Sequence, residues 1–174
     1  ELRVKHKAWK IPGRCWWTDS HGNVHSFTMA NENHPQSTVI YEKLEELCCT
    51  LTREGYSPRL HWVLQAVPDD EKEKILCGHS EKLAVACALI NTREGEPIRI
   101  TKNMQVCDEC HSAISLIAEV EKRNIQLVDV NRIHIFEDGK CICDSDQSPL
   151  GSIQIYGQTH PWKSSQDEKS LWNA

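Results

Sequence analysis

Long apolar runs and an excess of positive charge are both missing from this sequence. No stretch of the 174 residues approaches the roughly 20 consecutive apolar residues that a membrane-spanning helix needs, so we expect no membrane partner. The 20 Lys and Arg are outnumbered by 25 Asp and Glu, which gives a formal net charge of −5. A module that held nucleic acid by phosphate contacts alone would need the opposite sign. Any RNA or DNA substrate must therefore be delivered by something else.

The sequence also lacks a secretory signal and an initiating Met. It begins ELRVKHKAWKIPG, and four of these residues are Lys or Arg before the Pro-Gly pair. We interpret residues 1–11 as the junction with a missing upstream region, so that the chain is a domain cut from a longer protein.

Cysteine, in contrast, is abundant. Nine Cys residues would suggest disulfides in a small secreted protein, but the number is odd and no signal peptide precedes them. Four of them also stand at spacings typical of metal ligands. A reducing compartment is therefore the better prediction.

Apolar periodicity predicts an α/β fold, with a mostly mixed sheet covered by helices. The length suits one domain, which we place at 12–143, with residues 144–174 as a C-terminal extension. Strands are expected at 15–19 and 23–29, joined as an N-terminal hairpin, and at 97–102, 125–129, 132–136 and 140–143, the last two joined as a C-terminal hairpin. Helices are expected at 36–53, at 69–90 as one continuous element, and at 107–121, with an irregular connection at 56–68. Within the extension, residues 152–156 alternate like a strand, and we expect residues 144 to about 162 to fold back towards the pocket described next.

One His, one Glu and two Cys follow the order that a hydrolytic zinc centre uses. His79 and Glu81 form His-x-Glu, and Cys107 and Cys110 form Cys-x-x-Cys. This is nearly the signature of zinc nucleobase deaminases, in which His and two Cys hold the metal and Glu moves protons. Three protein ligands leave a fourth position for water, whereas a structural site with four ligands is the main alternative. Val106 departs from the signature, which has Pro before the first Cys.

A second group of potential metal ligands lies near the expected C-terminal hairpin. His134, Cys141 and Cys143 could hold a structural zinc if a fourth ligand arrives, and His111, directly after Cys110, is our candidate. A surface hairpin with free thiols is the alternative. We expect His25, Trp16 and Trp17 to belong to the surface and core of the first hairpin. Cys48 and Cys49 fit packing better than metal ligation.

The sequence closely resembles one family, the DYW deaminase domain at the C-terminus of plant pentatricopeptide-repeat RNA-editing factors. The matching stretches cover 12–143 and read PGRCWW, HPQSTVIYEKL, GYSP, EKEKILCGHSEKLAVA, GEPIRITKNMQVCDECHSAI and NRIHIFEDGKCIC. The resemblance implies a cytidine-deaminase-like fold, one catalytic and one structural zinc, and location in mitochondria or chloroplasts. It also implies single-stranded organellar RNA as substrate, delivered by an upstream repeat tract, with other editing factors as further partners.

Residue by residue, the resemblance assigns both groups of ligands. It makes His79, Cys107 and Cys110 the catalytic zinc ligands and Glu81 the proton shuttle. Its second zinc motif matches His111, His134, Cys141 and Cys143.

Three departures from the family bear on reaction direction. Ile135 stands where a second His is usual, Cys143 is followed by Asp144 rather than by the Asp-Tyr-Trp ending, and a tail continues to residue 174. These features resemble the variant, KP-type branch that is associated with uridine-to-cytidine editing. Amination at C4 is therefore the favoured expectation, with an amine donor that the sequence does not identify. Cytidine-to-uridine editing by hydrolytic deamination is the alternative, and a non-catalytic zinc-stabilised interaction module is the alternative of another class.

Overall fold

The structure is a computed structural model and describes residues 11–142. The junction, Cys143 and the whole extension, including the strand expected at 152–156, lie outside the described residues. None of the helices in the described part is long and apolar enough to cross a bilayer.

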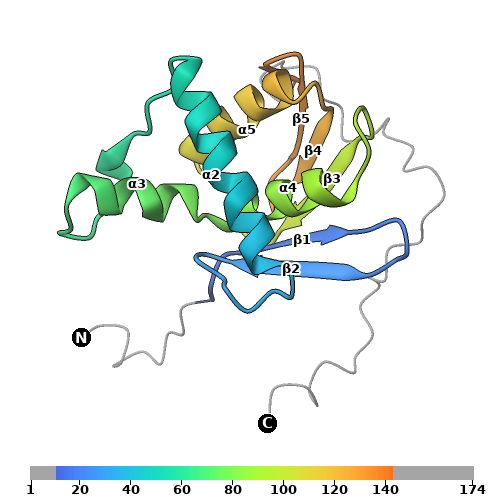
Figure 1. Cartoon of the computed structure of the whole chain (residues 1–174), viewed down its shortest axis with the longest axis horizontal. Helices are drawn as coiled ribbons and strands as arrows, with labels where there is room; N and C mark the ends of the chain where they lie inside the picture. Colours follow the sequence, from blue (N-terminus) through green and yellow to red (C-terminus); the bar gives the residue numbers. More distant parts are fainter. Residues whose placement is uncertain (1–10, 143–174) are drawn as a thin grey trace, which may run out of the picture.

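A six-stranded mixed sheet forms one layer of the fold (Figure 1). Its spatial order is β2-β1-β3-β4-β5-β6. The strands are β1 Arg14–Thr18, β2 Val24–Thr28, β3 Ile98–Lys102, β4 Ile125–Val128, β5 Ile133–Glu137 and β6 Lys140–Cys141. Neighbours pair antiparallel except β3 and β4, which pair parallel. The predicted α/β class with a mixed sheet is confirmed.

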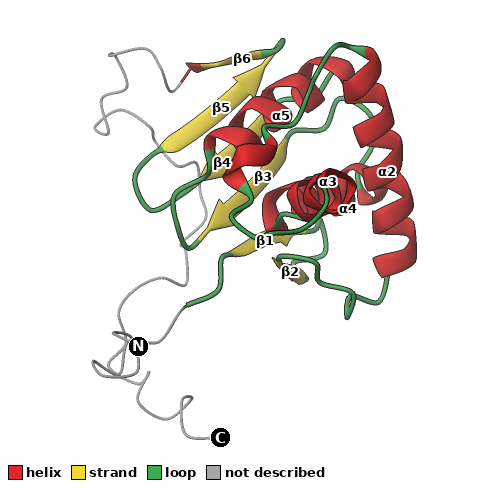
Figure 2. Ribbon diagram, turned by 90° about the vertical axis from the view of Figure 1, so that its left-hand side faces the viewer, coloured by secondary structure: helices red, strands yellow, loops and turns green. Residues whose placement is uncertain are grey.

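The helices cover one face of this sheet in two tiers. They are α2 Ser37–Arg53, α3 Asp69–Cys77, α4 Ser80–Asn91 and α5 Asp108–Val120, with a short 3-10 turn, η1, at Leu60–Trp62. Helix α4 packs on β1, β2 and β3, α5 packs on β5 and β6, and α2 packs on both helices. Figure 2 shows the strands on the left and α2 on the right, with α4 and α5 between them. Helix α5 also forms the crossover between the parallel strands β3 and β4, as parallel pairing requires.

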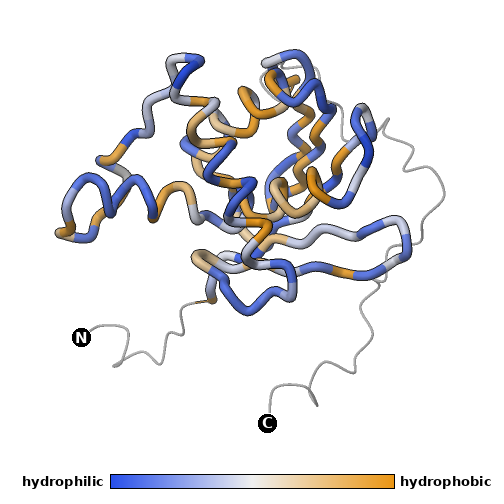
Figure 3. The backbone as a smooth tube through the Cα atoms, in the orientation of Figure 1, coloured by the Kyte–Doolittle hydropathy of each residue, from blue (hydrophilic) through white to orange (hydrophobic). Residues whose placement is uncertain are grey.

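Helix α4 is the most deeply buried element of the described chain. Its residues from Ser80 to Ala88 are all buried, and the Ala residues among them let the helix approach both α2 and the sheet closely. Residues alternate along β3, where Ile98 and Ile100 are buried while Arg99 is exposed, as expected for a strand covered on one face. Hydrophobic segments accordingly gather where the helices meet the sheet (Figure 3).

The prediction of one continuous helix over 69–90 is wrong. Helix α3 ends at Cys77, Gly78 follows it, and His79 adopts an extended conformation (φ −64°, ψ 143°) as the N-cap of α4. Glycine favours a helix end because it weakens helical structure, and the Gly78 carbonyl accepts a hydrogen bond from the Ala30 amide at 2.9 Å. The break matters because it places His79 and Glu81 at the start of a helix instead of on different sides of one.

Candidate metal centres

His79, Glu81, Cys107 and Cys110 come together at the junction of α4 and α5. Their ligand atoms all lie within 4.8 Å of one another. His79 Nδ1 lies 3.3 Å from Cys110 Sγ and 3.7 Å from Cys107 Sγ. With Zn–S near 2.3 Å and Zn–N near 2.0 Å, a tetrahedral zinc separates N and S ligands by about 3.5 Å. The three side chains therefore fit a zinc ion.

Two helix N-termini meet at this cluster. His79 is the N-cap of α4, and Cys107 is the N-cap of α5, where its Sγ accepts a hydrogen bond from the Cys110 amide at 3.4 Å. Unpaired amides and the helix dipole at such positions favour a negatively charged thiolate. Hydrogen bonds from the Cys110 thiol and from His79 lower the pKa of Cys107 to about 4, although burial opposes this. The lowered pKa of Cys107 favours its thiolate, the form of cysteine that binds a metal.

Glu81 is buried beside these ligands and has two partners of its own. Oε2 accepts a hydrogen bond from Ser80 Oγ at 2.9 Å, and Oε1 forms an ion pair with Lys102 Nζ of β3. Burial raises the pKa of the Glu81 carboxyl, but the ammonium of Lys102 outweighs it and holds the pKa below its usual value. Glu81 is therefore a carboxylate, the form that accepts a proton.

Lys102 was not found from the sequence. A signal was nevertheless present, because Lys102 continues the alternation of Ile98 and Ile100 and so falls on the buried face of β3. A Lys in a core-facing position needs a carboxylate partner. Glu81, a second buried charge, supplies it.

A second buried carboxylate, Glu109, lies between the two Cys ligands in sequence. It accepts hydrogen bonds from the Tyr56 hydroxyl and from the Arg59 amide, the latter at 3.2 Å. Lys82 Nζ lies 3.6 Å from its Oε1. These contacts attach the start of the irregular connection after α2 to the first turn of α5. Glu109 thus supports the helix start that carries Cys107 and Cys110.

The structure also brings together His111, His134 and Cys141, whose ligand atoms lie within 4.8 Å of one another. Cys143, the remaining predicted ligand of this second cluster, lies outside the described residues. His134 Nε2 is 3.1 Å from Asp129 Oδ2, so Nε2 carries the proton and Nδ1 has a free lone pair. That Nδ1 atom is buried without a hydrogen-bond partner. A carboxylate that orients a His in this way is typical of metal sites, so the residues fit a metal ion.

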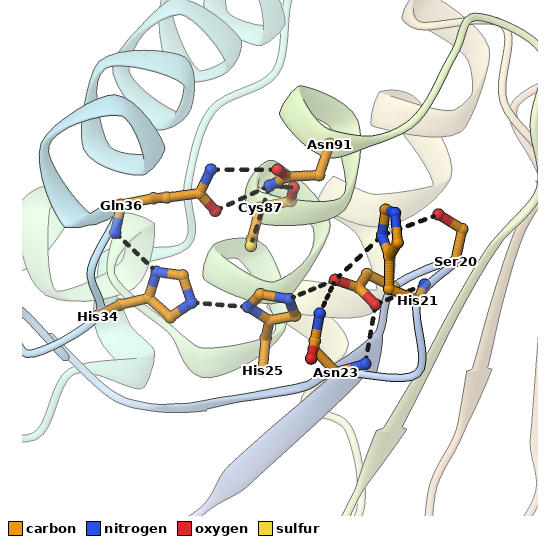
Figure 4. A network of polar contacts seen from close by, with 9 residues as sticks. Ser20, His21, Asn23, His25, His34, Gln36, Cys87 and Asn91 are labelled. Carbon is orange, nitrogen blue, oxygen red and sulfur yellow. Dashed lines mark hydrogen bonds and ion pairs between the residues drawn. The ribbon is translucent and has the colours of Figure 1, made fainter.

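A third group, His25, His34 and Cys87, also has ligand atoms within 4.8 Å of one another, and it was not predicted. Figure 4 shows these side chains in one polar network between the first hairpin, the start of α2 and α4. The backbone N–H of Gln36 donates a hydrogen bond to His34 Nδ1 at 3.1 Å, and His34 Nε2 lies 2.8 Å from His25 Nδ1.

The hydrogen-bond directions show that this third group is a structural network. Because Nδ1 of His34 accepts a hydrogen bond from the backbone N–H of Gln36, a neutral His34 carries its own proton on Nε2, which donates a hydrogen bond to His25 Nδ1. The proton of His25 then lies on Nε2, which is 3.5 Å from Asp19 Oδ2. With the protons in this order, neither His25 nor His34 keeps a lone pair that is free to bind a metal. The network instead ties the hairpin to α2, and the prediction that His25 belongs to the hairpin packing agrees with this.

One His and two Cys brought together beside a Glu, from His-x-Glu and Cys-x-x-Cys segments, is the set of zinc ligands and proton shuttle that nucleobase deaminases use. Residues 55–147, more than half of the chain, match the model of a family described as the DYW family of nucleic acid deaminases. The chain belongs to this family.

Curated plant proteins match a larger part of the chain. A chloroplastic pentatricopeptide repeat-containing protein of Arabidopsis thaliana is 45% identical over 134 residues, which are 77% of this chain and 15% of that protein. A mitochondrial pentatricopeptide repeat-containing protein of the same plant is 45% identical over 135 residues, 77% of this chain and 19% of that protein. The chain thus spans less than a quarter of the length of these relatives.

The Glu81–Lys102 pair can be tested with a double-mutant cycle. Lys102→Met leaves a buried carboxylate without its partner, which costs about 3–5 kcal/mol of unfolding free energy. Glu81→Gln combined with Lys102→Met removes both charges and should recover a large part of that loss. Urea unfolding of the four proteins at pH 7 measures this. If Glu81→Gln changes the unfolding free energy by the same amount with and without Lys102→Met, the two side chains are not coupled.

The histidine network predicts a pH dependence of stability. Burial, and then the neighbouring His25, lower the pKa of His34, so the unfolded chain takes up a proton there before the folded protein does. The stability due to neutral His34 is complete above the unfolded pKa of about 6.5 and is lost as the pH falls from there to the lower folded pKa. Melting temperatures from pH 8 to pH 5 should therefore fall more steeply for the native chain than for His34→Asn. If the melting temperatures of the native chain and of His34→Asn fall equally with pH, a lowered pKa of His34 is contradicted.

Proposed function

We propose that this chain is the catalytic domain of a zinc-dependent RNA-editing enzyme that acts at C4 of a pyrimidine. The observation that carries the proposal is the cluster of one His and two Cys with a buried carboxylate beside them, all with ligand atoms within 4.8 Å. His79, Cys107 and Cys110 would hold the metal and leave its fourth position open. A structural site with four protein ligands does not require a buried, ionised carboxylate such as Glu81, which in turn needs Lys102 as its counter-ion.

The residues of the chain supply the proton chemistry. A bound zinc would supply a Lewis acid that lowers the pKa of water towards about 7. In the hydrolytic direction Glu81 takes the proton from the water that attacks C4, and it returns protons to N3 and to the departing amine. Amination runs these steps backwards, with ammonia or another amine donor as the nucleophile and water as the leaving group. Lys102 stabilises the carboxylate form of Glu81, so Glu81 is ionised before the reaction, and its lowered pKa favours the later release of the proton that it accepts. The α4 and α5 starts hold these groups in one buried place.

For the second cluster we propose a structural zinc held by His111, His134, Cys141 and Cys143. The support is the buried, unpartnered Nδ1 of His134 and the carboxylate of Asp129 that orients the ring. Such a metal would join the first turn of α5 to β5 and β6. Structural zinc contributes to folding free energy, so this site would stabilise the C-terminal edge of the sheet.

The substrate we propose is single-stranded RNA of a mitochondrion or chloroplast, delivered by an upstream pentatricopeptide-repeat tract. The relatives carry that repeat in their names and are named chloroplastic or mitochondrial. The net charge of −5 supports delivery by another region, because this chain carries an excess of negative charge, which repels phosphates. Other editing factors would be further partners.

The direction we favour is uridine to cytidine, by amination at C4. The support is the sequence after Cys143, which has Asp144-Ser145-Asp146 in place of Asp-Tyr-Trp and continues to residue 174. The tetrahedral C4 adduct carrying both oxygen and nitrogen is common to both directions, so the same proton shuttle serves either. The family description, nucleic acid deaminases, favours the alternative of cytidine-to-uridine editing. A zinc-stabilised interaction module without activity would not need Glu81.

Glu81→Gln tests this proposal against the alternative without activity, and the edit that the native chain makes distinguishes the two directions. With the domain fused to a repeat tract of known target, sequencing of the RNA should show either edit reduced by at least about 100-fold, since general acid–base catalysis contributes 10²–10⁴-fold. The zinc content should stay unchanged, because Glu81 is not a ligand. Glu45→Gln, at an exposed position of α2, is the matched control and should edit normally. Undiminished editing by Glu81→Gln would contradict the proposed role, and so would loss of zinc from that variant.

A further inference from the structure

Two cysteines outside both metal clusters lie in direct contact. Cys48 is on α2 and Cys77 is the last residue of α3, and their Sγ atoms are 2.7 Å apart. The contact is a hydrogen bond in which either thiol could be the donor. A disulfide bond requires about 2.05 Å, so a sub-ångström shift of the side chains would bring the atoms to bonding distance.

The pair is also accessible to small molecules. Both side chains are partly exposed, and they line a cavity of about 590 Å³ together with Cys49, Tyr56, Glu73 and Lys82. Among the other described cysteines, Cys15, Cys87 and Cys110 are buried. The cavity therefore offers a small disulfide compound a route to Cys48 and Cys77 that these buried thiols lack.

We propose that Cys48 and Cys77 are a redox modification site, which a low-molecular-weight disulfide such as glutathione disulfide converts reversibly into a bond between α2 and α3. One protein thiolate attacks a glutathione sulfur, which forms a mixed disulfide and releases one glutathione thiolate. The second protein thiol loses its proton and attacks the protein-bound sulfur, which releases the second glutathione thiolate. The two thiolates take up the two protons, so two protein thiols are oxidised and one glutathione disulfide is reduced to two thiols.

The position of the bond gives it a structural consequence. Cys77 is followed by Gly78 and His79, so the bond would fix the segment that leads into α4 onto α2. Lys82 Nζ already attaches the same segment to α4 through its hydrogen bond to the Leu76 carbonyl, at 3.1 Å. Because the bond also closes a loop of the unfolded chain, it raises the melting temperature. It does so independently of the editing activity.

The test uses the whole zinc-loaded chain in glutathione buffers of increasing oxidised fraction. After alkylation of free thiols, peptide mapping by mass spectrometry should show Cys48 linked to Cys77, with the two thiols lost together. The oxidised protein should melt about 5–10 °C higher, and dithiothreitol should reverse both changes. Cys49→Ser, next to the pair on the same cavity, is the matched control and should oxidise like the native chain. Cys48→Ser and Cys77→Ser should stop at a glutathione adduct on the remaining thiol.

Three results would overturn the proposal. They are a link that involves Cys49 in place of either partner, a stable glutathione adduct on the native pair, and full retention of both thiols in fully oxidised glutathione. The peptide map of the native chain distinguishes these outcomes by itself. The test therefore stays decisive even if a Ser variant fails to fold, and it does not depend on whether the chain edits RNA.

Discussion

The buried ion pair between Glu81 and Lys102 connects the start of α4 to β3 in the middle of the sheet. Neither charge would be tolerated alone in this interior, since an uncompensated buried charge costs several kcal/mol. The pair therefore fixes how α4 begins, and with it the position of His79. The start of α5 faces the same point and brings Cys107 and Cys110 within 3.7 Å of His79. Core packing and site geometry thus depend on each other.

The residues that the sequence could place were those whose partners are close in the chain. His-x-Glu and Cys-x-x-Cys are local patterns, so His79, Glu81, Cys107 and Cys110 were found by spacing, and the structure brings them together. Lys102, Glu109 and Asp129 were missed because their roles come from contacts through space. The carboxylate of Asp129, for example, reaches His134 only because β4 and β5 pair antiparallel. Spacing alone gives no information on such pairings.

The fold prediction succeeded and failed for the same reason, because local patterns can be read from the sequence and contacts through space cannot. The hairpins and the central strand followed from alternation and turn residues, and the structure has strands at those places with ends shifted by a few residues. The break between α3 and α4 was missed because apolar residues continue on both sides of Gly78 at helical spacing. What ends α3 there is partly a tertiary contact, the hydrogen bond from the Ala30 amide to the Gly78 carbonyl. The extended conformation of His79 follows from that break.

The central proposal is that three side chains hold a zinc ion with one position left open, beside a carboxylate that does not bind the metal. Anomalous diffraction at the zinc absorption edge from crystals of the domain tests it most directly. We expect a peak bonded to His79 Nδ1 and to the Sγ atoms of Cys107 and Cys110, with Zn–S near 2.3 Å and a non-protein fourth ligand. A fourth ligand from the protein, Glu81 included, or a zinc peak absent from this cluster would contradict it.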